Sequence, residues 1–342
     1  MIFVVLFFLG FSLLFYVLLA GADFGAGMVE LFSSKKNQTI TKKTVYRVMG
    51  PVWEANHIWI IILIVILWIG FPKFYNVLMI SLHIPLTLML LGITLRGVAF
   101  VFRHYDAYKD KSQLLYNWLF KISSLLTPVF IGMTFGALLS GKIIVNDVAK
   151  HAFPDLYIFP WLNIFSILIG IFFALLCAFL AAVLLIGEAD EFTKKTYIKR
   201  ASNFILALVI TGFIVLLYGY FKKIPFVIFF VSNAYAISAV IVSGILLFPL
   251  WLCIKKGRRI WSRFLAGFQV LLILTAAFMP IFPDILFTKE GSLSLMDGVA
   301  PDSVINTLGI SLIIGGLIIL PGLFHLLKSF KMIKILDKFP KP

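Results

Sequence analysis

The feature that most constrains this chain is the recurrence of long apolar runs, about 18 residues or more with almost no charge, along its whole length. An α-helix rises about 1.5 Å per residue, so about 20 apolar residues cross the roughly 30 Å of hydrocarbon in a bilayer. Hydrophobic residues make up 61% of the 342 residues and charged residues 13%, against about 45–50% and about 25% in soluble domains. A soluble core of this size cannot bury so much apolar surface. The sequence therefore predicts an all-α, polytopic transmembrane helix bundle.

About nine transmembrane spans are expected from these runs. They are Ile2–Leu31, Glu54–Phe71, Phe74–Phe102, Leu114–Leu139, Ile158–Ile186, Ala201–Phe221, Phe226–Ile254, Arg263–Phe287 and Ser303–Leu327. The first run has no positive region before it and is longer than the apolar part of a signal peptide, so we expect it to be retained as a helix. The loops between the spans are short, which predicts a single integral membrane domain over residues 1–342.

The positions of Lys and Arg predict the orientation of the bundle. Of these residues, 22 fall in the loops after spans one, three, five and seven and in the C-terminal tail, whereas six fall in the alternate loops. Because loops rich in Lys and Arg stay in the cytoplasm, the N-terminus is predicted outside and the C-terminus in the cytoplasm. The net charge of +15 is explained by these loops, so no nucleic-acid partner is expected.

Several acidic and basic side chains fall inside the spans, where an ionised group costs about 2.5–3.5 kcal/mol on insertion scales. Asp23 and Glu30 are seven residues apart, which places them on one face of the first helix. The predicted helix directions bring both of them, with Glu54, Arg96 and Glu188, toward the cytoplasmic face. The outer half of the bundle is almost free of charge.

Two interpretations of this one-sided cluster remain open. The acids could form an entrance for protons or ions from the cytoplasm. Alternatively, the charges could fix helix packing, with Arg96 paired to Asp23 or Glu54. We predict a structural charge network that contains Arg96, Arg103 and Glu188.

Cofactor and catalytic motifs give little support for chemistry within this chain. Haem iron needs axial ligands at one depth, but the predicted depths of His57 and His83 differ by roughly 10 Å. The cysteines, Cys177 and Cys253, lie within spans and form no CxxC pair, so neither a metal site nor a disulfide is expected. No nucleotide-binding, metalloprotease or nucleophile motif is present. Accordingly, no catalytic, cofactor-binding or metal-binding residue is predicted.

Three stretches resemble subunit II of the cytochrome bd-type quinol oxidases. They are GADFGAGMVELF at the end of the first span, GPVWEANHIWIIILIVILWIGFP across the second, and LHIPLTLMLLGITLRGVAFVFR along the third. The resemblance covers roughly the first 105 residues, and the number of spans agrees with it beyond that point. It implies two four-helix bundles, at 1–140 and 155–288, and a ninth helix at 303–328.

The resemblance also implies the function. Members of this family form a heterodimer with a haem-bearing subunit I, which carries b and d haems, oxidises quinol and reduces oxygen to water. Subunit II has no redox haem, stabilises the pair and sometimes holds a quinone or lipid. A small single-span subunit is present in some complexes. The implied location is the bacterial cytoplasmic (inner) membrane.

The resemblance further implies a hydrophilic path from the cytoplasm, which maps to Glu54, next to Trp53, and to Asp23. Together with Glu30 and His57, these are the proton-path candidates of this chain. The sequence departs from the family at three positions. Glu54 stands where Asp is common, His57 where an acidic or other polar residue is common, and His83 where an aromatic residue is common.

A different class of protein remains as an alternative. The cluster of acids would also suit a secondary transporter with a cytoplasm-facing site. Such transporters often have broken helices at matching positions in two halves. Here Pro85 has only a poor counterpart in Pro249, which weakens this alternative.

Overall fold

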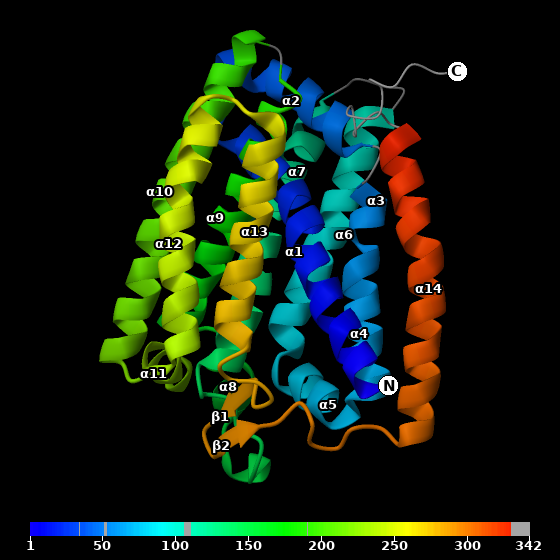
Figure 1. The fold of residues 1–342 in the computed structure, drawn as a ribbon, viewed down its shortest axis with the longest axis vertical. Coiled ribbons are helices and arrows are strands. Elements are labelled where there is room, and N and C mark those ends of the chain that lie inside the picture. Colours follow the sequence, from blue (N-terminus) through cyan, green and yellow to red (C-terminus); the bar gives the residue numbers. More distant parts are fainter. Residues whose placement is uncertain (34, 51–52, 106–110, 190, 330–342) are drawn as a thin grey trace.

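The structure, a computed structural model, describes residues 1–329 except 34, 51–52, 106–110 and 190. The chain forms a helical bundle with one small hairpin (Figure 1). The helices are α1 (Ile2–Leu31), α2 (Lys35–Met49), α3 (Trp53–Asn56), α4 (Ile58–Gly70), α5 (Pro72–Ser81), α6 (His83–Tyr105), α7 (Ser112–Leu139), the 3₁₀ turn η1 (Val148–Lys150), α8 (Phe153–Tyr157), α9 (Ile164–Ile186), α10 (Glu191–Phe221), α11 (Pro225–Ser232), α12 (Ala234–Lys255), α13 (Arg259–Phe278) and α14 (Asp302–Ser329). The strands β1 (Leu286–Thr288) and β2 (Gly291–Leu293) pair antiparallel.

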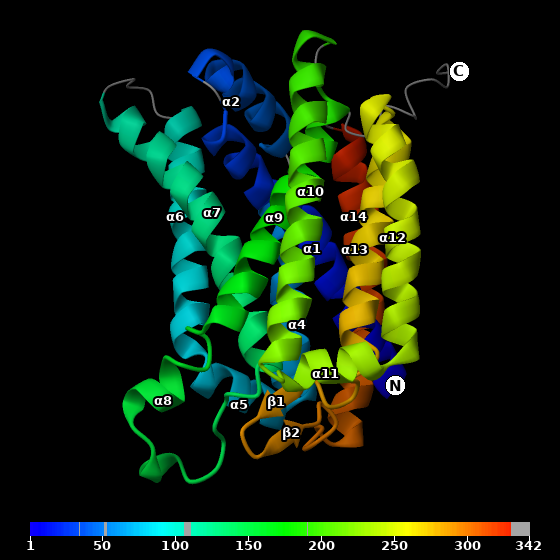
Figure 2. The same ribbon diagram turned by 90° about the vertical axis from the view of Figure 1, so that its left-hand side faces the viewer.

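The predicted fold class is confirmed. Eight described helices are long and apolar enough to cross a membrane, and the α4–α5 pair brings the number to nine if it counts as one span. The membrane-spanning helices run side by side, and their connections gather at the two ends of the bundle (Figures 1 and 2). We call the end where α1 finishes the basic end, because the Lys- and Arg-rich segments lie there.

The predicted boundary between the second and third spans is wrong. We expected a third span over Phe74–Phe102, but α5 turns by 117° from α4, and the third long helix begins at His83. Pro72 stands in the first turn of α5, where its missing N–H costs nothing. Figure 1 shows α5 lying across the end of the bundle that holds the N-terminus. Hydropathy did not reveal this bend, because both helices are apolar.

The seventh and eighth predicted spans also differ from the structure. The expected span Phe226–Ile254 is divided at Asn233, whose side-chain oxygen accepts hydrogen bonds from the N–H groups of Tyr235 and Ala236 and caps α12. The expected span Arg263–Phe287 ends early, at Phe278, and Leu286–Thr288 forms strand β1 instead.

The segment after α1 was expected to be a basic loop, but it contains a helix. α2 lies across the basic end of the bundle (Figures 1 and 2). Its buried residues recur at helical spacing, with Thr41, Val45, Val48 and Met49 turned inward. This amphipathic pattern is short and was hidden by five Lys and Arg residues.

Small residues bring the central helices close together. A Cβ at Gly132 of α7 would lie 2.7 Å from the Cα of Gly170 in α9, and one at Gly136 would lie 2.6 Å from the Cα of Ser166. Lipid tails are as apolar as the helices, so close contact between backbones takes the place of hydrophobic driving force. α7 and α9 therefore form the rigid centre, and α1, α6 and α10 pack around them.

Candidate functional site

The charged residues inside the bundle form two successive ion pairs between α1 and α6. In the first pair, Arg96 donates from Nη1 to Asp23 Oδ2 at 2.6 Å and from Nη2 to Asp23 Oδ1 at 2.8 Å. Arg96 Nη2 also reaches the Asp23 carbonyl oxygen at 2.9 Å, and its Nε donates to Ser124 Oγ of α7 at 3.0 Å. Asp23 is 0% exposed and Arg96 1%. Each nitrogen of the guanidinium therefore has an acceptor.

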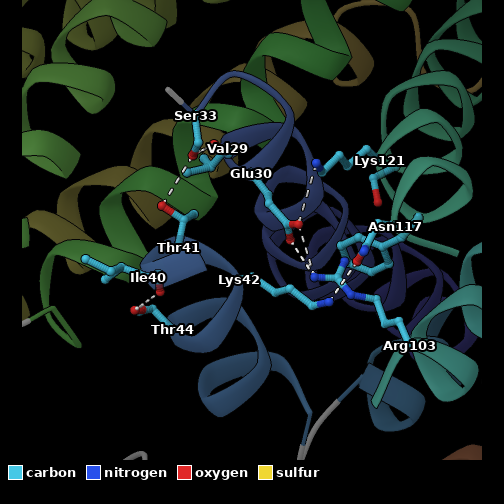
Figure 3. A network of polar contacts seen from close by, with 12 residues as sticks. Val29, Glu30, Ser33, Ile40, Thr41, Lys42, Thr44, Arg103, Asn117 and Lys121 are labelled. Atoms are coloured by element: carbon cyan, nitrogen blue, oxygen red, sulfur yellow. Dashed lines mark hydrogen bonds and ion pairs between the residues drawn. The ribbon is translucent and has the colours of Figure 1, made fainter. Parts of the chain in front are cut away.

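The second pair lies one heptad further along both helices. Arg103 Nη2 donates to both carboxylate oxygens of Glu30, at 3.1 and 2.8 Å, and Lys121 Nζ of α7 stands 4.0 Å from Glu30 Oε1 (Figure 3). Glu30 is 1% exposed and Arg103 5%. In the described part of the chain, Arg103 Nε and Nη1 are buried without a hydrogen-bond partner. The second pair is thus less completely satisfied than the first.

One aromatic ring lies between the two pairs. The Cζ atoms of Arg96 and Arg103 are 5.0 and 4.4 Å from the centroid of Phe120 on α7, and Arg96 also lies 5.2 Å from the Phe24 ring. Such cation–π contacts are worth about 2 kcal/mol when desolvated. We refer to Asp23, Arg96, Glu30 and Arg103 as the ion-pair ladder. Since α1 and α6 each pack on α7, the arginine side chains link three helices.

The other proton-path candidates lie near the start of the second span. Trp53 begins α3 and packs against Phe100 of α6, with ring centroids 5.6 Å apart. Glu54 belongs to α3, but its side chain lies outside the described part of the structure. His57 precedes α4, and its ring lies 5.9 Å from that of Phe24, the neighbour of Asp23 in sequence. Trp53 and His57 therefore lie next to residues that adjoin the ladder in sequence.

Glu188, which we grouped with Arg96 and Arg103, belongs to a separate cluster. It follows the end of α9 and pairs with Arg259 at 2.6 Å and Arg263 at 3.1 Å, both from the first turns of α13. This cluster ties α9 to α13 at the basic end. The charges thus divide into two groups because Glu188 stands beyond the end of its helix, whereas the ladder is inside.

Sequence reasoning missed the contribution of α7. Ser124 accepts from Arg96, Phe120 lies between the arginines, and Lys121 Nζ stands 4.0 Å from Glu30 Oε1. The spacing of Phe120, Lys121 and Ser124 follows one face of a helix, which was the available signal. It could not be interpreted without knowing that α7 faces α1.

His57 and His83 lie at opposite ends of the bundle. His57 stands at the start of α4, at the basic end, whereas His83 starts α6 at the opposite end. His83 is exposed, its Nδ1 lies 2.9 Å from the Ile80 carbonyl oxygen, and its ring packs 5.1 Å from that of Tyr157. The two rings therefore cannot bind one iron. Among the described residues, no group of three metal-ligating side chains comes together.

A second feature is an apolar cavity of about 450 Å³ between α9, α10, α12 and α13. The wall is formed mainly by aromatic and aliphatic side chains, among them Phe172, Phe213, Phe230 and Leu247. One polar pair stands in it. Ser243 Oγ bonds to Gln269 Oε1, and Gln269 Nε2 donates to the Ser243 carbonyl oxygen at 2.8 Å. The volume falls within the range of small-molecule sites.

The fold and the site together define a class of protein. This is a polytopic α-helical membrane protein whose intramembrane charges are paired and sealed at one end of the bundle, beside a lipophilic cavity in the other half.

The comparisons then identify the family. The sequence model of the family described as cytochrome bd terminal oxidase subunit II matches residues 1–330, and the chain belongs to this family. One chain of the bd oxidase structure from Geobacillus thermodenitrificans has the same fold, with a TM-score of 0.74 and 18% sequence identity over 95% of this chain and 97% of that chain.

Two curated relatives agree with this assignment. Cytochrome bd ubiquinol oxidase subunit 2 of Bacillus subtilis (strain 168) is 30% identical over 162 residues, which are 47% of this chain and 46% of that protein. Cytochrome bd-I ubiquinol oxidase subunit 2 of Escherichia coli (strain K12) is 25% identical over 162 residues, which are 47% of this chain and 42% of that protein. The matched stretch spans less than half of each relative.

Proposed function

We propose that this chain is the haem-free accessory subunit of a cytochrome bd-type quinol:oxygen oxidoreductase. Its partner would be a haem-bearing oxidase subunit I, in which b and d haems oxidise quinol and reduce oxygen to water. A small single-span subunit could complete the complex. The proposal includes the bacterial cytoplasmic membrane as the location, with the N-terminus outside and the basic end in the cytoplasm, and the bundles 1–140 and 155–288 with the ninth helix 303–328.

The observation that supports this proposal best is the family match over residues 1–330. The fold similarity over 95% of the chain is consistent with it. The printed names of the two relatives describe subunits of ubiquinol oxidases. The transporter alternative is disfavoured by the same family match over residues 1–330.

The chain would also contribute a proton entrance. Intramembrane acids typically mark proton relays, and oxygen reduction consumes protons. Glu54 is the proposed entry residue, with Trp53 and His57 beside it and Asp23 and Glu30 further inside. Asp23 is held by Arg96 through two hydrogen bonds, so it already belongs to a structural ion pair. Glu54 is therefore the better candidate for exchanging protons, since α3 (Trp53–Asn56) stands at the start of the second span, at the basic end of the bundle.

A structural quinone or lipid is proposed for the apolar cavity. The cavity of about 450 Å³ has the size and apolar lining that a lipid tail requires. The Ser243–Gln269 pair satisfies its own hydrogen bonds, so a bound chain would not need to supply polar groups. Its role would be to fill space and stiffen the loosely packed half.

Purification of the tagged complex tests the proposal. The wild type should bring down a polytopic partner and show b- and d-type haem bands in a reduced-minus-oxidised spectrum. Glu54→Gln should lower quinol-driven oxygen uptake by about tenfold or more, because Gln cannot carry a proton, while the haem content stays unchanged. Glu54→Asp, which keeps the carboxylate, is the matched control. A colourless preparation without a partner contradicts the accessory role, and full turnover of Glu54→Gln contradicts the proton entrance.

A further inference from the structure

We propose that α2 is a hinged lid over the ion-pair ladder, and that protons from the basic side reach Glu30 and the residues behind it only when α2 lifts. The inference rests on the proton entrance proposed above and names its gate. α2 is a separate helix that lies across the end of the bundle (Figures 1 and 2).

The burial of Glu30 shows that something covers the ladder. Glu30 is the penultimate residue of α1, so a carboxylate there would normally meet water, yet it is 1% exposed. Val29 belongs to the same apolar cluster as Val45, Val48 and Met49 of α2. The inner face of α2 therefore closes the end of the bundle where Glu30 would otherwise be open.

A few polar contacts hold the lid in place. Two of them involve neighbouring residues in the middle of α2: Ser33 Oγ, just beyond α1, donates to Thr41 Oγ1 at 3.2 Å, and Lys42 Nζ donates to Asn117 Oδ1 of α7 at 2.8 Å. Figure 3 shows Lys42 reaching from α2 toward the residues around Glu30. Near the C-terminal end of α2, Arg47 donates to the carbonyl oxygen of Glu188. The three contacts reach α1, α7 and the end of α9, so the lid is attached to separate helices.

The electrostatics oppose a tightly closed lid. α2 contains five cationic residues and no acid, and the cations Arg103 and Lys121 lie buried beneath it. Like charges gathered in a poorly solvated site repel each other. The second ion pair also leaves Arg103 Nε and Nη1 without an acceptor among the described residues, an arrangement that costs free energy when buried. Water admitted by an open lid would relieve both effects.

Hydrogen–deuterium exchange of the intact complex tests whether the Lys42–Asn117 hydrogen bond holds α2 in place. Lys42→Met keeps the length of the side chain but loses the bond to Asn117. We expect the amides of α2 to exchange about tenfold faster, since a charge-assisted hydrogen bond is lost. Lys43→Met is the matched control, because Lys43 is exposed and its substitution removes the same charge from the same helix. Equal exchange in the two variants would show that the Lys42–Asn117 hydrogen bond does not hold α2 closed.

A disulfide that ties α2 to the end of α1 tests whether the movement of α2 is needed for oxygen uptake. Ser33→Cys and Thr41→Cys together place two sulfur atoms where the hydroxyls are 3.2 Å apart, close enough to join α2 to the end of α1. Oxidation should lower oxygen uptake several-fold, and reduction should restore it. Each single variant, oxidised in the same way, controls for effects on the native Cys177 and Cys253.

The outcomes separate the lid from the proton entrance. If Glu54→Gln slows turnover but the oxidised double variant works at full rate, the entrance stands and the lid is wrong. A different result would separate the lid from Glu54. If Lys42→Met speeds exchange in α2 and oxidation slows the double cysteine variant, but Glu54→Gln has no effect on turnover, then the lid moves and matters but does not control access to Glu54. The gate is supported if turnover is slow both in Glu54→Gln and in the oxidised double cysteine variant, and if reduction restores turnover in the double cysteine variant.

Discussion

Two regions of this bundle solve the same packing problem in different ways: the α7–α9 centre with the ladder packed on α7, which we call the first half, and the outer pair α12 and α13, which we call the second half. Around α7 and α9, about two thirds of the membrane-spanning stretch is buried, 67% and 61%, and glycines let the backbones touch. In α12 and α13 the shares are 17% and 28%, and a cavity of about 450 Å³ separates the helices. The first half holds four paired charges, whereas the second has one neutral polar pair in its cavity wall.

The difference shows what charges require inside a membrane. A buried ion pair is tolerated only when its geometry is good and the remaining donors are satisfied, and this needs helices held closely by small residues. An apolar cavity has no such requirement and can exist in a looser bundle. We therefore expect the first half to be sensitive to single substitutions and the second half to be tolerant.

The largest effect is expected from Arg96→Ala. It leaves the carboxylate of Asp23, which is 0% exposed, without its partner, and breaking a buried pair costs about 3–5 kcal/mol. The yield and thermal stability of the purified complex should fall strongly.

Two controls sharpen that test. The double variant Asp23→Ala, Arg96→Met removes both charges and should recover most of the stability. Lys150→Ala breaks an exposed pair, with side chains 73% and 66% exposed, and should change stability by less than about 0.5 kcal/mol. If Arg96→Ala is as mild as Lys150→Ala, the ladder does not stabilise the bundle.

A glycine substitution should separate the halves by a smaller margin. At Gly25 of α1 a Cβ would overlap the carbonyl group of Cys177 in α9, whereas at Gly244 of α12 it would meet no atom within 4 Å. Gly25→Ala should cost about 1–3 kcal/mol or more through overpacking. Gly244→Ala should be neutral or stabilise slightly, by about 0.5–1 kcal/mol. Thermal unfolding of the two complexes measures the contrast, and similar melting temperatures would contradict it.

The smallest effect on stability is expected from filling the cavity. Ala239→Leu adds bulk where Ala239 lines the cavity, and stability should change by no more than about 1 kcal/mol. Quinone or lipid that co-purifies with the complex, measured by mass spectrometry, should decrease. Ala236→Leu is the contrast, since Ala236 is 0% exposed and does not line the cavity. Unchanged lipid in Ala239→Leu would mean that the cavity holds none.

The fold class followed from the sequence because hydropathy reports directly on the membrane. The predicted span Leu114–Leu139 agrees with α7 to within two residues. The seven-residue spacing of Asp23 and Glu30 also placed them correctly on one face. Local chemistry of this kind needs no knowledge of neighbouring helices.

The rest depended on interactions that hydropathy does not report. The bend at Pro72 and the cap at Asn233 divide apolar runs that look continuous. The pairing of Arg103 with Glu30 required the arrangement of α1 against α6. α2 was missed because its five cations outweigh three buried apolar residues, Val45, Val48 and Met49.

The ladder has a consequence for how such chains can change in length. Asp23 and Glu30 are seven residues apart, as are Arg96 and Arg103, and both helices run in the same direction. One residue inserted between the two acids would rotate Glu30 by about 100° around α1 and separate it from Arg103. A matching insertion between the arginines would not restore the contact, because Arg103 would turn by the same angle in the same sense around α6 and the two side chains would then point to opposite sides. Single-residue insertions and deletions should therefore be excluded from both segments, which are 73 residues apart, even when they occur as a pair.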